Sequence, residues 1–155
     1  MKCPACFNEL MEIRVGGLAV DVCAGGCGGI WFDAFELKQV EALPTSAANE
    51  LVSIQRDPLV QVDKHRKRSC PRCLEIKLMR HFFSPRRRVE VEHCPSCAGF
   101  WLDAGELATI VGEMKEKRAE AEDSEADSPA LTAAIIRRLY QMRLAESEQG
   151  TSGED

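Results

Sequence analysis

The sequence contains no apolar run that approaches the roughly 18 residues needed to cross a bilayer, so no membrane-spanning segment is expected. It also lacks a signal-peptide-like apolar segment before the first cysteine, Cys3. Both absences favour a soluble, cytoplasmic protein. In a reducing compartment, paired cysteines serve as metal ligands rather than disulfides, and this sets the interpretation of the cysteines in the chain.

All the cysteines fall into two short clusters, which are Cys3, Cys6, Cys23 and Cys27, then Cys70, Cys73, Cys94 and Cys97. A segment of about 40 residues buries too little apolar surface to fold alone, so it needs disulfides or a bound metal ion to stabilise it. A Cys-x-x-Cys pair turns two thiolates toward one ion, and two such pairs complete a tetrahedron. We therefore predict two zinc ions, each held by four cysteines. Iron is the minor alternative, because ligand identity alone does not separate the two metals.

Four thiolates around one dication carry a net charge near −2, which the protein must offset. Backbone amides and nearby cations supply that stabilisation at metal sites. Lys2, Arg72 and His93 lie close to the cysteines in the sequence and are expected in this role.

The two cysteine clusters belong to an internal repeat. After the last cysteine of each cluster, Trp follows at +4, Asp at +6, Glu at +9 and Leu at +10. Duplication of one module explains this register. The first copy carries one extra residue inside its second cysteine pair, and Gly25-Gly26 can absorb it because glycine tolerates unusual φ angles.

Each copy is predicted to form a β-hairpin. Alternating apolar residues indicate strands over 10–15 and 18–22 in the first copy, with a Gly-Gly turn between them. The second copy has corresponding strands over 78–83 and 89–92. The basic residues 86–88 should then occupy the tip of the second hairpin.

Each hairpin is followed by a capping-box pattern, which predicts a helix with Asp as N-cap and Glu three residues later. The pairs are Asp33 with Glu36 and Asp103 with Glu106. The tryptophans Trp31 and Trp101 precede these aspartates, and each should pack over its own hairpin as a small core.

These residues resemble the transcription-factor-IIB-type zinc-finger family, whose pattern is Cys-Pro-x-Cys, a hairpin, Cys-Pro-x-Cys-x-Gly and Trp-Leu-Asp-x-Gly-Glu-Leu. The second copy matches at Cys70, Pro71, Cys73, Cys94, Pro95, Cys97, Gly99, Trp101, Leu102, Asp103, Gly105, Glu106 and Leu107. The first copy departs at Ala24, where Pro is usual, at Phe35, where Gly is usual, and at its extra residue. The resemblance implies two tandem zinc ribbons. It carries no promoter or polymerase role, since fold does not imply function.

The predicted fold class is a small metal-stabilised α+β protein with two zinc-ribbon modules, each a β-hairpin with two cysteine knuckles followed by a helix, plus a C-terminal amphipathic helix. The expected boundaries are module one over 1–43, a connector over 44–69, module two with a long helix over 70–115, a charged linker over 116–128, the amphipathic helix over 129–146 and a disordered tail over 147–155. The connector should hold a short helix over 45–54 and a short strand over 59–62. Loss of one metal should unfold its own module and leave the other intact.

Charge is distributed unevenly along the chain. Residues 56–100 include eleven basic and five acidic side chains, which gives +6 there and −11 elsewhere for a total of −5. Two basic runs could bind nucleic acid through its phosphates: Lys64, Arg66, Lys67 and Arg68 in the first, and Arg86, Arg87 and Arg88 in the second. A solvated basic surface that compensates the acidic flanks explains the same pattern.

The sequence favours a non-enzymatic adaptor that binds a protein partner. Four cysteines close each site, whereas catalytic zinc keeps an open position. The thioredoxin-like βαβ pattern around a redox Cys-x-x-Cys is also absent, so a redox or metal-dependent enzyme ranks last. A transcription-related nucleic-acid-binding ribbon is the alternative. The partner, the pathway and the oligomeric state stay open at this point.

Overall fold

The structure, a computed structural model, describes residues 1–122 and 137–138. Residues 1–114 form one compact unit, and the chain from residue 115 onward forms another. The predicted amphipathic helix over 129–146 and the tail over 147–155 lie outside the described residues, apart from 137–138, which are helical. Among the described residues, no helix is long and apolar enough to span a membrane.

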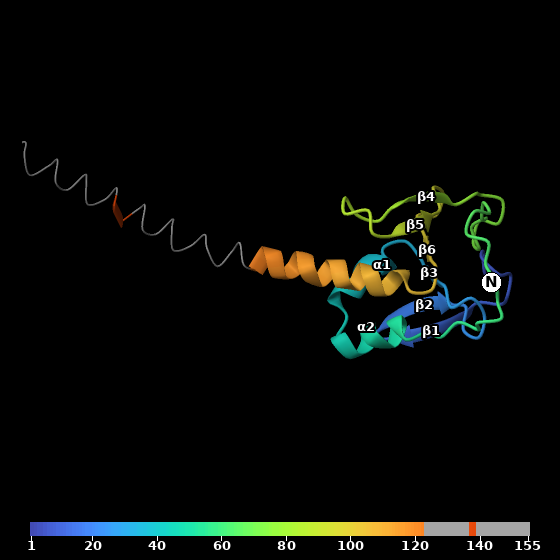
Figure 1. The fold of residues 1–155 in the computed structure, drawn as a ribbon, viewed down its shortest axis with the longest axis horizontal. Coiled ribbons are helices and arrows are strands. Elements are labelled where there is room, and N and C mark those ends of the chain that lie inside the picture. The colour runs from blue at the N-terminus through green and yellow to red at the C-terminus, as the bar shows by residue number, and fades with distance from the viewer. Residues whose placement is uncertain (123–136, 139–155) are drawn as a thin grey trace, which may run out of the picture. The chain divides into compact units, whose positions relative to one another are not determined.

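Six strands form one antiparallel sheet in the order β1-β2-β3-β6-β5-β4 (Figure 1). The strands are β1 (Met11–Val15), β2 (Leu18–Val22), β3 (Ile30–Phe32), β4 (Met79–Phe82), β5 (Glu90–His93) and β6 (Phe100–Leu102). Counted from its own edge of the sheet, the second copy repeats the first, since β4, β5 and β6 occupy the positions that correspond to β1, β2 and β3. The sheet therefore has an approximate twofold symmetry about its centre.

The two predicted hairpins are confirmed. Strand β1 pairs with β2 around Gly16 and Gly17, whose φ angles of +60° and +88° suit the tight turn of a two-residue hairpin. Strand β4 pairs with β5. The connecting turn closes where the Arg87 amide donates to the Ser84 carbonyl at 3.0 Å, which places the basic residues 86–88 at this tip.

The pairing of β3 with β6 at the centre of the sheet was not predicted from the sequence. In this antiparallel pair, Trp31 lies opposite Trp101, and Ile30 and Phe32 lie opposite Leu102 and Phe100. Runs of consecutive apolar residues are typical of strands that are covered on both faces. The pairing joins the two modules into one continuous sheet, so they are not two separate modules linked only by the connector.

Helices cover one face of the sheet, which we call the helix face. They are α1 (Glu36–Gln39), the short 3₁₀ helix η1 (Val40–Ala42), α2 (Thr45–Val52) and, of a last helix over 106–122, the part over 106–114. Helix α2 confirms the helix expected over 45–54. The strand expected over 59–62 is wrong, because those residues form a turn and a loop.

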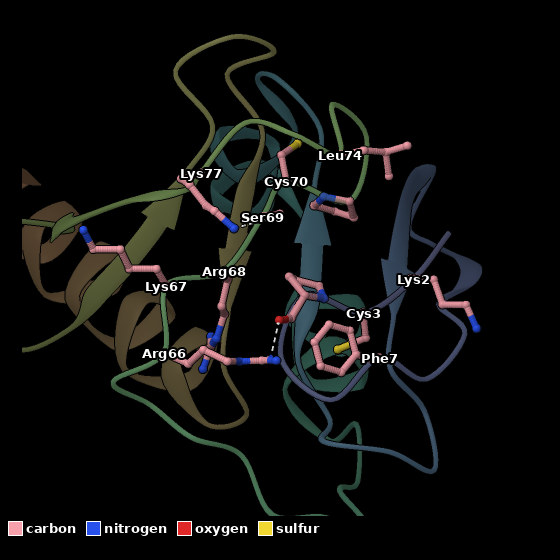
Figure 2. A pocket seen from close by; sticks show the side chains of 12 residues that line it. Lys2, Cys3, Phe7, Arg66, Lys67, Arg68, Ser69, Cys70, Leu74 and Lys77 are labelled. Atoms are coloured by element: carbon pink, nitrogen blue, oxygen red, sulfur yellow. Dashed lines mark hydrogen bonds between the residues drawn. The ribbon is translucent and has the colours of Figure 1, made fainter.

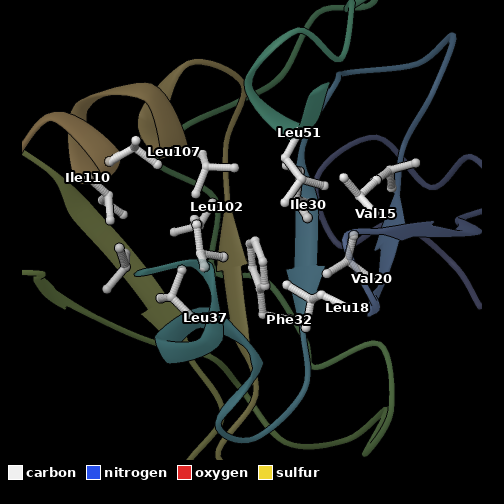
Figure 3. Packing of buried hydrophobic residues seen from close by; sticks show 14 of the residues in the cluster. Val15, Leu18, Val20, Ile30, Phe32, Leu37, Leu51, Leu102, Leu107 and Ile110 are labelled. Atoms are coloured by element: carbon white, nitrogen blue, oxygen red, sulfur yellow. The ribbon is translucent and has the colours of Figure 1, made fainter. Parts of the chain in front are cut away.

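The core beneath the helices is built from both copies (Figure 3). Ile30 and Phe32 of the first copy pack in the same cluster as Leu102, Leu107 and Ile110 of the second. Each such side chain contributes roughly 1.5–3 kcal/mol when fully buried. Separating the copies would return part of that surface to water, so the shared core opposes independent folding.

The opposite face, which we call the metal face, carries Trp31 and Trp101 together with the cysteines. A Cβ atom added at Gly29 would overlap the Trp101 indole, and one added at Gly99 would overlap the Trp31 indole. Each ring therefore lies against the glycine of the other copy. This exchange corrects the expectation that each tryptophan packs over its own hairpin.

We expect Gly99→Ala to destabilise the protein by about 1–3 kcal/mol or more, because the new methyl group must displace the Trp31 ring in a packed core. Denaturant unfolding of the metal-loaded protein measures the change. Amide shifts in an NMR spectrum should appear in both copies, since the displaced ring belongs to the first.

Gly112→Ala is the matched control. A Cβ atom at Gly112 meets nothing within 4 Å, and the residue lies inside the helix over 106–122. Replacing a helical glycine by alanine should raise stability by up to about 1 kcal/mol. Equal effects of the two substitutions would contradict the exchanged packing.

Candidate metal centre

The structure brings each predicted cysteine cluster together around one point. Within each cluster, the four Sγ atoms lie within 4.8 Å of one another. The closest Sγ–Sγ separations in the first cluster are 3.5 Å for Cys3 with Cys27 and 3.4 Å for Cys6 with Cys23. In the second cluster they are 3.6 Å for Cys70 with Cys97 and 3.9 Å for Cys73 with Cys94.

These separations fit a tetrahedral metal ion. A Zn–S bond of about 2.3 Å places the sulfurs of a regular tetrahedron about 3.8 Å apart. A disulfide would require about 2.05 Å, and all the cysteines are free thiols. Both clusters therefore match four-thiolate coordination of a dication such as zinc.

Local backbone geometry forms each knuckle. The Phe7 amide donates to the Cys3 carbonyl at 3.0 Å, and the Leu74 amide donates to the Cys70 carbonyl at 2.9 Å. Phe7 and Leu74 have positive φ angles of 68° and 54°, which reverse the chain directly after each first cysteine pair. The two knuckles are thus repeats of one turn.

Backbone amides point at the sulfurs, as expected for thiolates. The Cys6 amide donates to Cys3 Sγ at 3.4 Å, and the Cys73 amide donates to Cys70 Sγ at 3.3 Å. Such donors stabilise the negative charge of the cluster.

The cations that the sequence suggested for this role have other partners. Lys2 Nζ lies 3.1 Å from Glu9, and Arg72 pairs with Asp33. His93 lies against His81. The expectation that Lys2, Arg72 and His93 offset the thiolates is therefore not supported by the geometry.

The extra residue in the first cluster sits at Gly25 and Gly26, as predicted. Gly25 adopts φ +67°. A Cβ atom at Gly26 would lie only 2.5 Å from Cys23 Sγ. Glycine is therefore needed at the first position for its backbone angle and at the second for space beside a ligand sulfur.

The thiols of the first cluster oppose one another's ionisation. A hydrogen bond from Cys27, supported by backbone amides, lowers the pKa of Cys3 to about 5. Burial, followed by the hydrogen bond with Cys6, raises the pKa of Cys23 to about 12. In the second cluster, burial raises the pKa of Cys70. One thiolate forms readily and then opposes the others, so a bound dication is what would hold four thiolates together.

The aspartates after the tryptophans do not cap their helices by the predicted route. Helix α1 begins after Phe35, with no side-chain cap. Asp33 Oδ1 accepts instead from Trp31 Nε1 at 2.9 Å. The other half of the capping box is present, because the Asp33 amide donates to Glu36 Oε2 at 2.7 Å. The second copy repeats both contacts at 3.0 and 2.7 Å.

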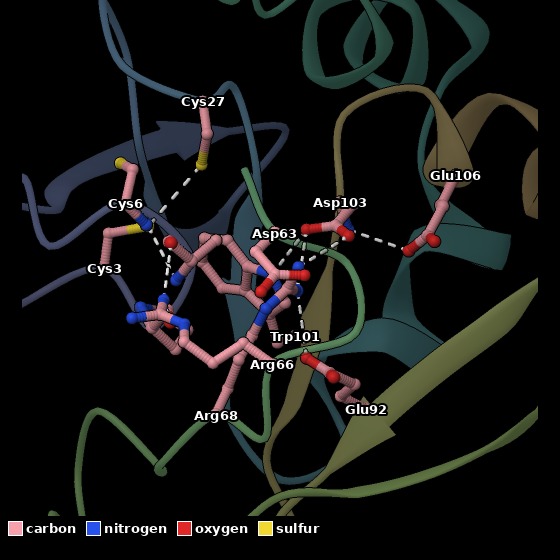
Figure 4. Close-up of polar contacts among 12 residues, drawn as sticks. Cys3, Cys6, Cys27, Asp63, Arg66, Arg68, Glu92, Trp101, Asp103 and Glu106 are labelled. Atoms are coloured by element: carbon pink, nitrogen blue, oxygen red, sulfur yellow. Dashed lines mark hydrogen bonds and ion pairs between the residues drawn. The ribbon is translucent and has the colours of Figure 1, made fainter. Parts of the chain in front are cut away.

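In the second copy, the equivalent residue, Asp103, joins a buried ionic network (Figure 4). The Arg68 side chain is 1% exposed and donates to both carboxylate oxygens of Asp103, at 2.8 and 3.0 Å. It also donates to Glu92 at 3.0 Å, and Arg80 donates to Glu92 at 2.6 Å. Removing one partner from such a buried network typically costs about 3–5 kcal/mol. Arg68 therefore holds the fold and is not available to a ligand.

Two further residues of the first basic run, Arg66 and Lys67, line a groove of about 400 Å³ beside the knuckles (Figure 2). Arg66 donates to the Pro4 and Ala5 carbonyls at 3.0 and 2.7 Å, and its guanidinium stacks 4.3 Å from the centre of the Phe7 ring. Lys67 lines the groove and is exposed, and Lys64 is exposed in the connector. Arg66 thus ties the connector to the first knuckle, while the two lysines face solvent.

The second basic run is exposed on the turn between β4 and β5. The Arg87 guanidinium lies 5.6 Å from the centre of the Phe82 ring. Arg88 Nε lies 4.0 Å from Glu113 Oε1. The fold therefore commits part of this run to intramolecular contacts as well.

An apolar groove of about 350 Å³ on the helix face was missed by sequence reasoning. It is lined by Phe35, Leu37, Lys38, Glu41, Phe83, Ala98, Phe100 and Met114, so both copies contribute. Phe35 is 78% exposed at a φ angle of +72°. The available signal was the departure of Phe35 from the glycine that the family pattern has there.

We expect two zinc ions per chain by elemental analysis, and fewer than two in Cys97→Ser, which keeps only three thiolates at its site. Structural zinc supplies about 10–16 kcal/mol of apparent binding energy. Because the copies share a sheet and a core, amide dispersion should be lost in both, which revises the expectation of an intact first module.

Ser96→Ala is the control, since Ser96 is exposed beside the ligand and should leave two ions bound. A Cys97→Ser protein that keeps two zinc ions would overturn the ligand assignment. One that keeps a folded first copy would overturn the coupling.

Comparison with known proteins agrees with this geometry. The transcription factor zinc-finger family matches residues 2–42 and 69–113, which together make up more than half of the chain. The two matched regions coincide with the two copies around the two cysteine clusters. Neither a curated protein nor a solved structure matches the chain. The chain therefore belongs to the transcription factor zinc-finger family, as two tandem copies of its zinc ribbon.

Proposed function

We propose that this protein is a non-enzymatic adaptor, stabilised by two zinc ions, that binds a partner protein through the apolar groove around Phe35. The supporting observation is an exposed aromatic side chain held at an unfavourable backbone angle beside an apolar depression. The partner would insert an apolar side chain there.

The backbone at Phe35 argues that the side chain is kept for a purpose. A residue with a Cβ atom in the left-handed region costs roughly 1–2 kcal/mol. The second copy has Gly105 at the equivalent position, with φ +88°, and therefore avoids this cost. Strained residues of this kind cluster at binding sites, and an exposed aromatic beside an apolar groove is typical of an interaction surface.

The composition of the groove suits a protein partner. Leu37, Phe83, Phe100 and Met114 provide an apolar floor, and Lys38 and Glu41 provide charged groups of both signs. An apolar centre with polar surroundings is the usual anatomy of a protein interface. Aromatic anchors that fill such pockets carry much of the binding energy.

The proposal of a non-enzymatic role rests on the metal sites. Four thiolates fill the coordination sphere of a tetrahedral ion and leave no position for substrate or water. The thiols must also stay reduced to hold a metal, which favours a cytoplasmic location.

We expect Phe35→Gly to abolish partner binding while leaving the fold intact or more stable, by up to about 1–2 kcal/mol, because it relieves the left-handed strain. Affinity capture from cells, quantified against wild type, measures binding, and denaturant unfolding measures stability. Leu59→Ser is the matched control, since Leu59 is 87% exposed and lies outside the groove. Undiminished capture by Phe35→Gly would rule out the groove as the binding surface.

A nucleic-acid-binding role is the second candidate, supported by the exposed Arg86 and Arg87 at the tip of the second hairpin and by the exposed Lys64 and Lys67. Phosphate contacts from such a tip would position the protein without reading bases. This candidate is weaker, because Arg66 and Arg68 are held by intramolecular contacts.

Replacing Arg86 and Arg87 together by Ala tests this role while keeping the ion pair between Arg88 and Glu113. If the tip binds duplex DNA, the log–log salt slope should flatten by roughly 0.9 for each phosphate that the tip no longer neutralises. Phe35→Gly should leave that binding unchanged. Absence of wild-type binding even at low salt would leave the adaptor as the surviving proposal, as would nuclease-resistant capture of the partner.

A further inference from the structure

Two histidines on neighbouring strands converge on the helix face of the sheet. His81 of β4 and His93 of β5 place their Nδ1 atoms 3.0 Å apart. Their rings meet edge to face, with centroids 4.6 Å apart and an interplanar angle of 84°. His93 lies directly opposite Phe100 of β6 in the sheet register.

This pair is separate from the four-thiolate sites. Successive side chains of a strand point to opposite faces, so His93 projects to the helix face while Cys94, the next residue, packs among the buried cysteines of the metal face. The His81 side chain is exposed, so the pair is open to a solute ion.

The geometry of the pair suits two ligands of one transition-metal ion. Metal–nitrogen bonds to imidazole are about 2.0–2.1 Å long. Two nitrogens at such bond lengths and 3.0 Å apart subtend an angle of about 95° at the metal. That angle is typical of the tetragonal and octahedral coordination that Cu(II) and Ni(II) prefer over a tetrahedron.

We propose that His81 and His93 form a third metal site, distinct from the two structural ones, which binds a divalent transition-metal ion with two imidazoles and leaves the other positions to water. Neutral imidazole is a common ligand for Ni(II), Cu(II) and Zn(II). With two protein ligands, the site would exchange its ion readily, unlike the closed four-thiolate sites. The proposal does not depend on the adaptor function.

The test titrates Ni²⁺ into untagged protein that already holds its two zinc ions, using isothermal titration calorimetry at fixed pH. A chromophoric chelator in a parallel sample reports whether zinc is released, which separates addition at a new site from exchange at the thiolates. We expect one equivalent of Ni²⁺ to bind without zinc release. In the NMR spectrum, the paramagnetic ion should broaden amide signals around His81 and His93 first.

His81→Ala should weaken Ni²⁺ binding by about tenfold or more, because a chelating pair becomes a single ligand. His93→Gln is a second variant that removes the other ligand. Both variants should keep two zinc ions and the wild-type amide dispersion. His65→Ala is the matched control, because it removes an exposed imidazole from the connector and should leave binding unchanged.

The proposal is overturned if wild-type protein binds no Ni²⁺ without losing zinc, since the histidines then form only a hydrogen-bonded pair. It is also overturned if His81→Ala binds as tightly as wild type. Equal weakening by His65→Ala would attribute the binding to scattered surface imidazoles and would likewise overturn it.

Discussion

The pairing of β3 with β6 is the contact on which the rest of this structure depends. Two three-residue strands, apolar on both faces, meet with Trp31 opposite Trp101. The indoles then lie against Gly99 and Gly29 of the opposite copies, where any side chain would overlap them. Aromatic rings of this size dominate the energetics of small cores, so each copy supplies cover that the other lacks.

The cysteine clusters and the shared core lie on opposite faces of the sheet, and both stabilise the same fold. Four thiolates fix the two knuckles of a copy, and the knuckles hold the ends of its hairpin. The helices then bury the other face in one core that contains residues of both copies. Loss of the metal at one site is therefore expected to weaken packing at the other, because the sheet between them is continuous.

The basic residues illustrate how a charge count differs from a binding surface. Arg68 pairs with Asp103, 35 positions further along the chain, and Arg72 pairs with Asp33, 39 positions back. Arg66 donates to carbonyls of the first knuckle. A buried guanidinium with carboxylate partners stabilises one arrangement of the chain, and it adds nothing to the potential that a phosphate would meet.

Local patterns in the sequence were enough to determine the ligand set, the two hairpins and helix α2. Cysteine spacing reflects the reach of a knuckle, and apolar alternation reflects the two faces of a strand, so neither depends on distant residues. The pairing of β3 with β6 joins residues about 70 positions apart. Each strand has only three residues, and a segment of that length is too short to show a hydrophobic period. That pairing decided the exchange of the tryptophans, the groove around Phe35 and the shared core. The aspartates show the same limit: their capping-box spacing is local, but Asp103 accepts from Arg68, 35 positions away, because a buried guanidinium needs acceptors that only the folded chain brings to it.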